Sequence, residues 1–166
     1  TSELREGVRE VLDHMKKTTP NCFHFCFQPS TSTAFLGASP ERLYKRENRF
    51  IETEALAGTR PRGSSLQEDQ KLKRELLRSK KDCHEHRIVV EEIQKSLLSL
   101  CLRFKKDENM SVMKLESGQH LLSCFRGSLK RDISDADILR ALHPTSAVAG
   151  CPTEFALREI TSLEPF

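Results

Sequence analysis

The stretch FIETEALAGTRPRG, residues 50–63, sets the expected fold class. Residues 50–56 combine aromatic, β-branched and other apolar residues, which predicts a strand. Residues 57–63 hold two glycines and a proline, so they predict a loop that ends the strand. Residues 67–104 then carry many charges, with apolar side chains at every third or fourth position, and this spacing predicts a long helical stretch.

Helices and strands continue on both sides of this stretch without a regular βαβ period. The expected helices are residues 3–17, residues 134–142 with Ser134 as the N-terminal cap, and a last helix that opens at Pro152. The expected strands are residues 22–27, 34–37, 112–115 and 120–129, of which the first two form a hairpin. We therefore expect an α+β fold with a mixed sheet, in one partial domain over residues 1–166.

Composition excludes several classes of protein. The 166 residues include 27 Lys or Arg and 24 Asp or Glu, with no Trp and one Tyr. A balanced charge without a basic tail or aromatic platform argues against nucleic-acid binding. No apolar run approaches the roughly 20 residues of a membrane span, so we expect no membrane partner. The six cysteines lie mostly in apolar runs without a CxxC pair, which predicts buried free thiols and a protein that is not secreted.

A pair of acids in the long helical stretch is the first candidate site. Asp82 and Glu85 are three residues apart, so both carboxylates point from one helix face. Carboxylate oxygens suit Mg²⁺, although a solvated charged face is the plainer alternative. A zinc site at Cys83, His84 and His86 is disfavoured because adjacent helical positions diverge by about 100°.

Polar residues beside the expected strands form further candidates. Glu41 follows a strand in a loop held by Pro40, where it fits a general acid or a surface turn. Backbone N–H groups at Gly58 and Thr59, with nearby arginines, suit an anion such as a carboxylate. The loop at residues 143–152 brings small residues to a helix start, and His120 lies within a strand, where a core histidine is the usual explanation.

These blocks occur in one order along the chain. They are GASPERL at 37–43, TEALAGTRPRG at 53–63, KDxxEH at 81–86, QHL at 119–121, HPTxAVAGCP at 143–152 and LEPF at 163–166. In this order the sequence strongly resembles the chorismate-binding enzymes, and among them the isochorismate synthases. The resemblance covers nearly the whole chain from Phe23 onward.

The resemblance implies an α+β fold, chorismate as the substrate and Mg²⁺ as the cofactor. It implies that Glu41 is the general acid that protonates the departing C4 hydroxyl. Glu85 matches a Mg²⁺ ligand, and Asp82 matches a position that supports the metal through water. The positions that match contacts to the substrate are Leu56, Gly58, Thr59, His120, Ala147 and Gly150.

Two of these positions bear on the choice of reaction. Alanine at 147 resembles the isochorismate synthases, whereas lyase and aminating members tend to have threonine there. Leu56 matches a position that steers water against ammonia. The resemblance thus implies that water adds at C2 of chorismate while hydroxyl leaves C4, rather than formation of salicylate or an aminated product.

The resemblance also implies a domain that is incomplete at both ends. The family's lysine base lies upstream of the first helix, and its second metal glutamate follows the block at 163–166. We expect this chain alone to be inactive, with a non-catalytic remnant or a split module completed by another chain as alternatives. The expected compartment is the cytoplasm in a bacterium and a plastid or other organelle in a eukaryote.

Overall fold

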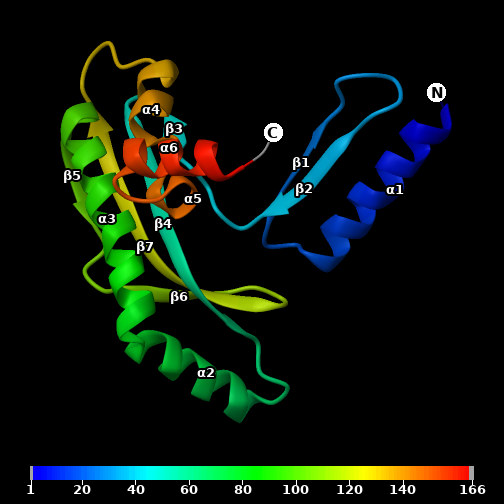
Figure 1. The fold of residues 1–166 in the computed structure, drawn as a ribbon, viewed down its shortest axis with the longest axis horizontal. Coiled ribbons are helices and arrows are strands. Elements are labelled where there is room, and N and C mark those ends of the chain that lie inside the picture. Colours follow the sequence, from blue (N-terminus) through cyan, green and yellow to red (C-terminus); the bar gives the residue numbers. More distant parts are fainter. Residues whose placement is uncertain (1, 165–166) are drawn as a thin grey trace. The chain divides into compact units, whose positions relative to one another are not determined.

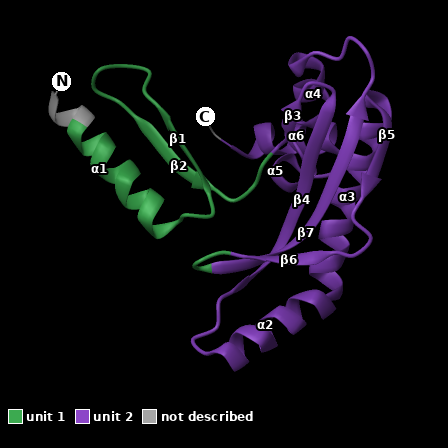
Figure 2. Cartoon of the chain, turned by 180° about the vertical axis from the view of Figure 1, so that it is seen from behind, with its two compact units in different colours: residues 1–42, 115–117 green, residues 43–114, 118–166 purple. Residues whose placement is uncertain are grey.

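The computed structural model describes residues 2–164, with side chains from Glu6 onward (Figure 1). The chain divides into two compact units, one of residues 1–42 with 115–117 and one of residues 43–114 with 118–166 (Figure 2). The expectation of one partial domain stays a prediction, and Pro165 and Phe166 of the last sequence block lie outside the described residues.

The first unit is a helix followed by a hairpin. Helix α1 (Ser2–Thr18) precedes strands β1 (Phe23–Phe27) and β2 (Phe35–Ser39), which pair antiparallel. This confirms the expected helix and hairpin. The phenylalanine side chains of the hairpin remain largely exposed within the described residues: Phe23, Phe25, Phe27 and Phe35.

The second unit is built on an antiparallel sheet in the order β3-β4-β7-β5, with β6 also paired to β7. Its strands are β3 (Lys45–Glu47), β4 (Phe50–Pro61), β5 (Cys101–Lys106), β6 (Ser111–Lys114) and β7 (Gly118–Leu129). The expected loop at 57–63 is wrong, because β4 continues to Pro61 along the start of β7. Partners distant in sequence supply the hydrogen bonds that local composition does not announce.

The expected helical stretch at 67–104 is two helices and the start of a strand. Helix α2 (Leu66–Arg78) ends at Ser79, and α3 (Lys80–Leu100) begins there. The Ser79 backbone N–H donates to the Leu76 carbonyl, while its hydroxyl accepts from the Asp82 backbone N–H. One serine therefore ends one helix and caps the next.

Three shorter helices follow the sheet. They are α4 (Asp135–Leu142), α5 (Ser146–Ala149) and α6 (Thr153–Leu163). Ser134 caps α4, and Asp137 completes a capping box with it, so the expected start of this helix is confirmed. No local pattern predicted α5, which is a single turn.

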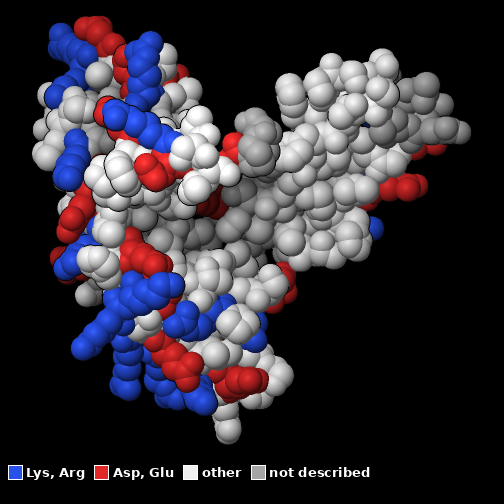
Figure 3. Space-filling view, in the orientation of Figure 1, with Lys and Arg blue, Asp and Glu red and all other residues white. Residues whose placement is uncertain are grey.

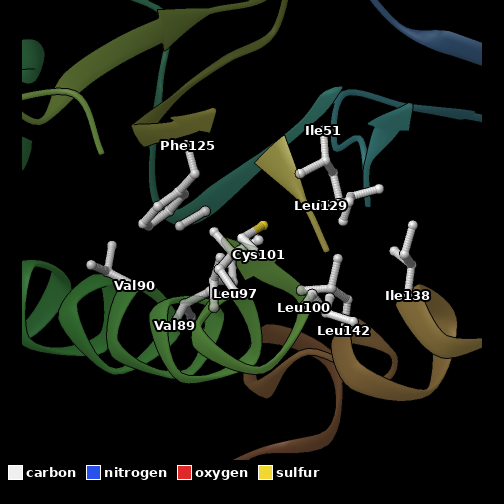
Figure 4. Packing of buried hydrophobic residues seen from close by; sticks show 12 residues of the cluster. Ile51, Val89, Val90, Leu97, Leu100, Cys101, Phe125, Leu129, Ile138 and Leu142 are labelled. Atoms are coloured by element: carbon white, nitrogen blue, oxygen red, sulfur yellow. The ribbon is translucent and has the colours of Figure 1, made fainter. Parts of the chain in front are cut away.

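The core lies between α3, α4 and one face of the sheet (Figure 4). The apolar stripe expected on the long helix is buried, from Val90 through Ile93 and Leu97 to Leu100. It packs with Phe125 and other residues from the sheet. The six cysteines are free, as expected, but the prediction that they are buried holds for Cys101 alone. The half-buried ones are Cys22, Cys83 and Cys124, and the exposed ones are Cys26 and Cys151.

Among residues 2–164, no helix is both long enough and apolar enough to cross a bilayer.

Candidate functional site

A β-bulge at Gly58 forms the centre of the candidate site. The register of β4 against β7 shifts between Ala57 and Thr59, and Gly58 has φ +79°. A Cβ at this position would lie 3.1 Å from Asp82 Cβ, on the first turn of α3. Glycine thus provides both the left-handed backbone and the close approach of helix and strand.

Thr59 and His120 face each other across the two strands directly after the bulge. Thr59 Oγ1 lies 3.0 Å from His120 Nδ1, and the two residues are register partners. Burial lowers the pKa of His120 below its ordinary value, and a hydrogen bond with the Gly58 backbone partly opposes this. A neutral imidazole has one N–H, and its tautomer decides whether Nδ1 donates to the Thr59 hydroxyl or accepts from it.

Asp82 is held by an arginine from the strand. Its side chain is 11% exposed, and Oδ2 accepts from Arg60 Nη2 at 2.8 Å. Hydrogen bonding with the Ser79 side chain, and then the Arg60 guanidinium, keep the pKa of Asp82 below its usual range. Asp82 is therefore an ionised, paired carboxylate.

Glu85 lies one turn further along α3 and is more accessible. Its side chain is 49% exposed, and Oε1 is 3.5 Å from Lys81 Nζ. An exposed pair of this kind contributes little energy, so it leaves the carboxylate open to another cation.

The acidic residues near the bulge differ in how well they fit Mg²⁺. Residues 2–164 contain no cluster of three or more His, Cys, Asp or Glu side chains arranged to hold a metal. Mg²⁺ usually keeps several waters and takes one or two protein carboxylates. Glu85 fits such a ligand, whereas one oxygen of Asp82 already binds Arg60.

The arginines near the bulge were expected to help hold an anion. Arg60 is instead paired with Asp82, and Arg62 with Asp69 at 2.6 Å. Each guanidinium group is thus already paired with a protein carboxylate. The backbone at the bulge and His120 are therefore the better candidates to bind an anion.

A buried network at Asp69 supports the same end of the sheet and was not predicted from the sequence. Asp69, on α2, also accepts from Lys114 on β6 and from the Gly63 backbone N–H at 3.2 Å. Gln119, fully buried beside His120, donates to the Pro61 carbonyl at 3.2 Å. These contacts tie the ends of β4, β6 and β7 to α2.

His86 is a second residue whose role the sequence did not reveal. It is buried, and Nε2 lies 2.9 Å from the Ser123 hydroxyl on β7. Burial lowers the pKa of His86, with the Ala57 backbone opposing the shift. His86 therefore attaches the first turns of α3, which carry Asp82 and Glu85, to the sheet.

Other predicted substrate positions lie elsewhere in the second unit. Leu56 is buried on β4 opposite Leu122. Ala147 lies exposed on α5, and Gly150 ends that helix with φ +83°. Helix α5 packs against α3, and a cavity of about 230 Å³ lies between α3 and residues 141–153.

Glu41 belongs to the first unit. It follows β2 and is half-buried, and its backbone N–H donates to the Ser39 hydroxyl at 3.3 Å. The structure thus brings Gly58, Thr59, His120 and Asp82 together, with Glu85 on the next turn of the same helix. The assigned roles of all these residues stay predictions.

The chain matches a known family of proteins along almost its whole length. Residues 3–166 match the family model described as chorismate binding enzyme. The chain is 44% identical over 146 residues to isochorismate synthase 2, chloroplastic, of Arabidopsis thaliana, covering 88% of this chain and 26% of that protein.

Solved structures agree with this match. The structure of MenF, the menaquinone-specific isochorismate synthase from Escherichia coli, superposes with a TM-score of 0.85 at 35% identity, over 93% of this chain and 36% of that one. A putative 2,3-dihydroxybenzoate-specific isochorismate synthase, DhbC from Bacillus anthracis, gives 0.87 at 35% identity, over 95% and 43%. The α+β class is thereby confirmed.

The matched proteins differ in the reaction that they are named for, and all are longer than this chain. Anthranilate synthase component 1 of Saccharolobus solfataricus is 37% identical over 158 residues, covering 94% of this chain and 37% of that protein. The relatives are therefore named for more than one reaction. The chain spans about a quarter to two fifths of the length of the relatives reported above.

Proposed function

Because the chain belongs to the chorismate-binding enzyme family, we propose that it forms part of an isochorismate synthase. In the proposed reaction, water adds at C2 of chorismate, the ring double bonds shift, and the hydroxyl leaves C4 as water. The attacking water loses one proton to a base outside these residues, and the leaving group gains one, so the overall change is an isomerisation.

The observation that carries the proposal is the polar surface where the β4 bulge meets α3. The Gly58 backbone, the Thr59 hydroxyl and the imidazole of His120 form a polar surface suited to the ring carboxylate. Placing the ring by fixed donors lowers the entropy cost of reaching the reactive arrangement.

In this proposal Glu85 holds Mg²⁺, and Asp82 supports it through water. Bound Mg²⁺ would neutralise the ring carboxylate and help to orient the ring. Glu41 donates the proton to the departing hydroxyl, and it must be protonated when it does so. Leu56, Ala147 and Gly150 shape the apolar and backbone surface around the substrate.

A second candidate is an aminating chorismate enzyme, favoured by the likeness to anthranilate synthase. Ala147 and Leu56 argue for water as the nucleophile, by the resemblance described above. One relative is named as chloroplastic and another comes from a bacterium, so we propose a plastid if the source is a plant and the cytoplasm if it is a bacterium. Completion of the site by a second chain stays a prediction.

The test is the product formed by the full-length protein that carries this chain. It is incubated with chorismate and Mg²⁺, with and without ammonium, and the products are separated by chromatography. We expect isochorismate in both cases. Anthranilate, aminodeoxychorismate or salicylate as the main product would replace the proposal with the corresponding family reaction.

A further inference from the structure

The structure assigns Arg60 as a positioning residue that fixes the Gly58–Thr59 bulge against α3. The inference deepens the proposed function and rests on it, since the bulge is the proposed carboxylate site. Arg60 itself contacts no proposed substrate atom here. It holds in place the backbone of Gly58 and Thr59, which is proposed to contact the substrate, and the first turn of α3.

Two hydrogen bonds of equal length define this role. Arg60 Nη1 donates to the Thr59 carbonyl at 2.8 Å, and Nη2 donates to Asp82 Oδ2 at 2.8 Å. One planar group therefore joins the backbone directly after the bulge to the first turn of α3. A guanidinium presents several donors in a fixed fork, whereas a lysine ammonium is a compact point charge.

The location explains why the contact is needed. A bulge interrupts the regular ladder and leaves the local backbone with fewer fixed partners. Gly58 is also the residue with the least steric restraint on its own conformation. Thr59 must keep its hydroxyl 3.0 Å from His120 Nδ1, so movement of its backbone would separate the two proposed carboxylate contacts.

Burial of the acid makes the contact strong. The side chain of Asp82 is 11% exposed and that of Arg60 is 30% exposed. Removal of the arginine would leave a largely buried carboxylate without its cation, which is costly. The pair therefore gives Asp82 a role that does not involve metal.

The two roles of Asp82 predict different behaviour in a double-mutant cycle. If Asp82 acts through Arg60, then Arg60→Gln, Asp82→Asn and the double variant have the same effect. If Asp82 acts on the metal independently, the effects of the two substitutions multiply. The cycle is measured in the full-length protein, with Arg126→Gln as a control, since Arg126 Nη1 makes an equally short 2.8 Å contact with Asp107.

We expect each single variant to raise KM for chorismate about tenfold with little change in kcat, and the double variant to do no more. Arg60→Lys should recover part of the loss, because it keeps the charge and loses the fork. Arg126→Gln should leave KM unchanged. Multiplying effects, or an unchanged KM in Arg60→Gln, would overturn the assignment.

Amide hydrogen exchange of residues 57–60 gives a readout that does not need turnover. Faster exchange at these residues in Arg60→Gln and in Asp82→Asn, with none in Arg126→Gln, is expected. Unchanged exchange in Arg60→Gln contradicts the positioning role even if the enzyme proves to catalyse another reaction. Absence of isochorismate from the wild type, with the exchange result as expected, would reject the proposed function alone.

Discussion

The two ends of the paired strands β4 and β7 differ in what their side chains do. At one end, Ile51, Phe125 and Leu129 are at most 1% exposed and pack with α3 (Figure 4). At the other end, beyond the bulge, Thr59 and His120 form a polar pair next to α3. One pair of strands therefore carries both the core and the candidate site, and the bulge at Gly58 separates them.

The polar end is also held differently. The apolar end is stabilised by burial, which acts without direction and tolerates small shifts. The polar end depends on directed contacts from Asp69, Asp82 and His86 to partners on other elements. Lys and Arg side chains gather over α2 beside it (Figure 3). Substitutions at the two ends should therefore have separable effects.

The largest effect is expected at the apolar end. Phe125→Ala removes a side chain that is 1% exposed, so the free energy of unfolding should fall by about 4 kcal/mol. Urea denaturation measures this loss. Phe125→Leu is the control and should cost about 1 kcal/mol. A loss near that of the control for the alanine variant would show that this end is not the main source of stability.

The next effect separates the directed contacts from burial. Asp69→Asn removes the anion between Arg62 and Lys114, which destabilises the folded state. The loss of stability at pH 7 should be smaller than for Phe125→Ala, because the two cations are 34% and 30% exposed and water can solvate them. Glu75→Gln is the control on the same helix, because its pair with Lys71 is exposed and 3.9 Å long.

The same variant tests the pH dependence of the polar end. Hydrogen bonds from Arg62 and Lys114 hold the pKa of Asp69 well below its usual range. The stability that it contributes is fully present above the unfolded pKa of about 4 and is lost as the pH falls toward the folded pKa. The difference in stability between wild type and Asp69→Asn should therefore shrink below pH 4. A constant difference down to pH 2 would refute this.

A smaller effect on stability is expected at the bulge itself. Gly58→Ala places a Cβ 3.1 Å from Asp82 Cβ in a left-handed backbone, which should cost about 2 kcal/mol. Chorismate turnover should fall as well, because helix and strand must separate. Gly7→Ala on α1 has no atom within 4 Å and should be neutral or stabilising. Wild-type stability and turnover in Gly58→Ala would show that the bulge is needed for neither the fold nor the site.

The smallest free-energy change is expected at the specificity position. Ala147→Thr adds a hydroxyl to the exposed face of α5 and should leave stability nearly unchanged. It should shift the products toward salicylate or, with ammonium, an aminated compound. An unaltered product ratio would mean that Ala147 does not select the nucleophile.

Short sequence patterns predicted the helices whose buried face or cap is determined by residues close together in the sequence. The three-to-four spacing from Val90 to Leu100 predicted the buried face of α3, and Ser134 predicted the start of α4. The strand beyond Ala57 was missed because glycine and proline there resemble a loop, while the deciding contacts come from residues 118–121 of β7. The strand from Cys101 was predicted as the end of the long helix, because its apolar residues continue the helical spacing, whereas its deciding partner is Leu129 on β7.

The candidate site likewise combines residues that were predicted from the sequence with supporting contacts that were not. Gly58, Thr59 and His120 were predicted, through the family resemblance, and the structure places them together. The contacts that support them join residues far apart in sequence, such as His86 with Ser123 and Arg62 with Lys114 through Asp69. A periodicity or a motif contains no information on such pairs, because each residue alone fits a solvated surface or a satisfied core position.

The most direct test of the polar end as a chorismate and Mg²⁺ site is the Mg²⁺ dependence of Glu85→Gln in the full-length protein. The control is Glu91→Gln on the same helix, which has a similar i,i+4 pair of 3.8 Å with Arg87. We expect Glu85→Gln to raise the Mg²⁺ concentration for half-maximal turnover by at least about tenfold, and Glu91→Gln to leave it unchanged. Equal Mg²⁺ dependence in Glu85→Gln and the wild type would contradict it.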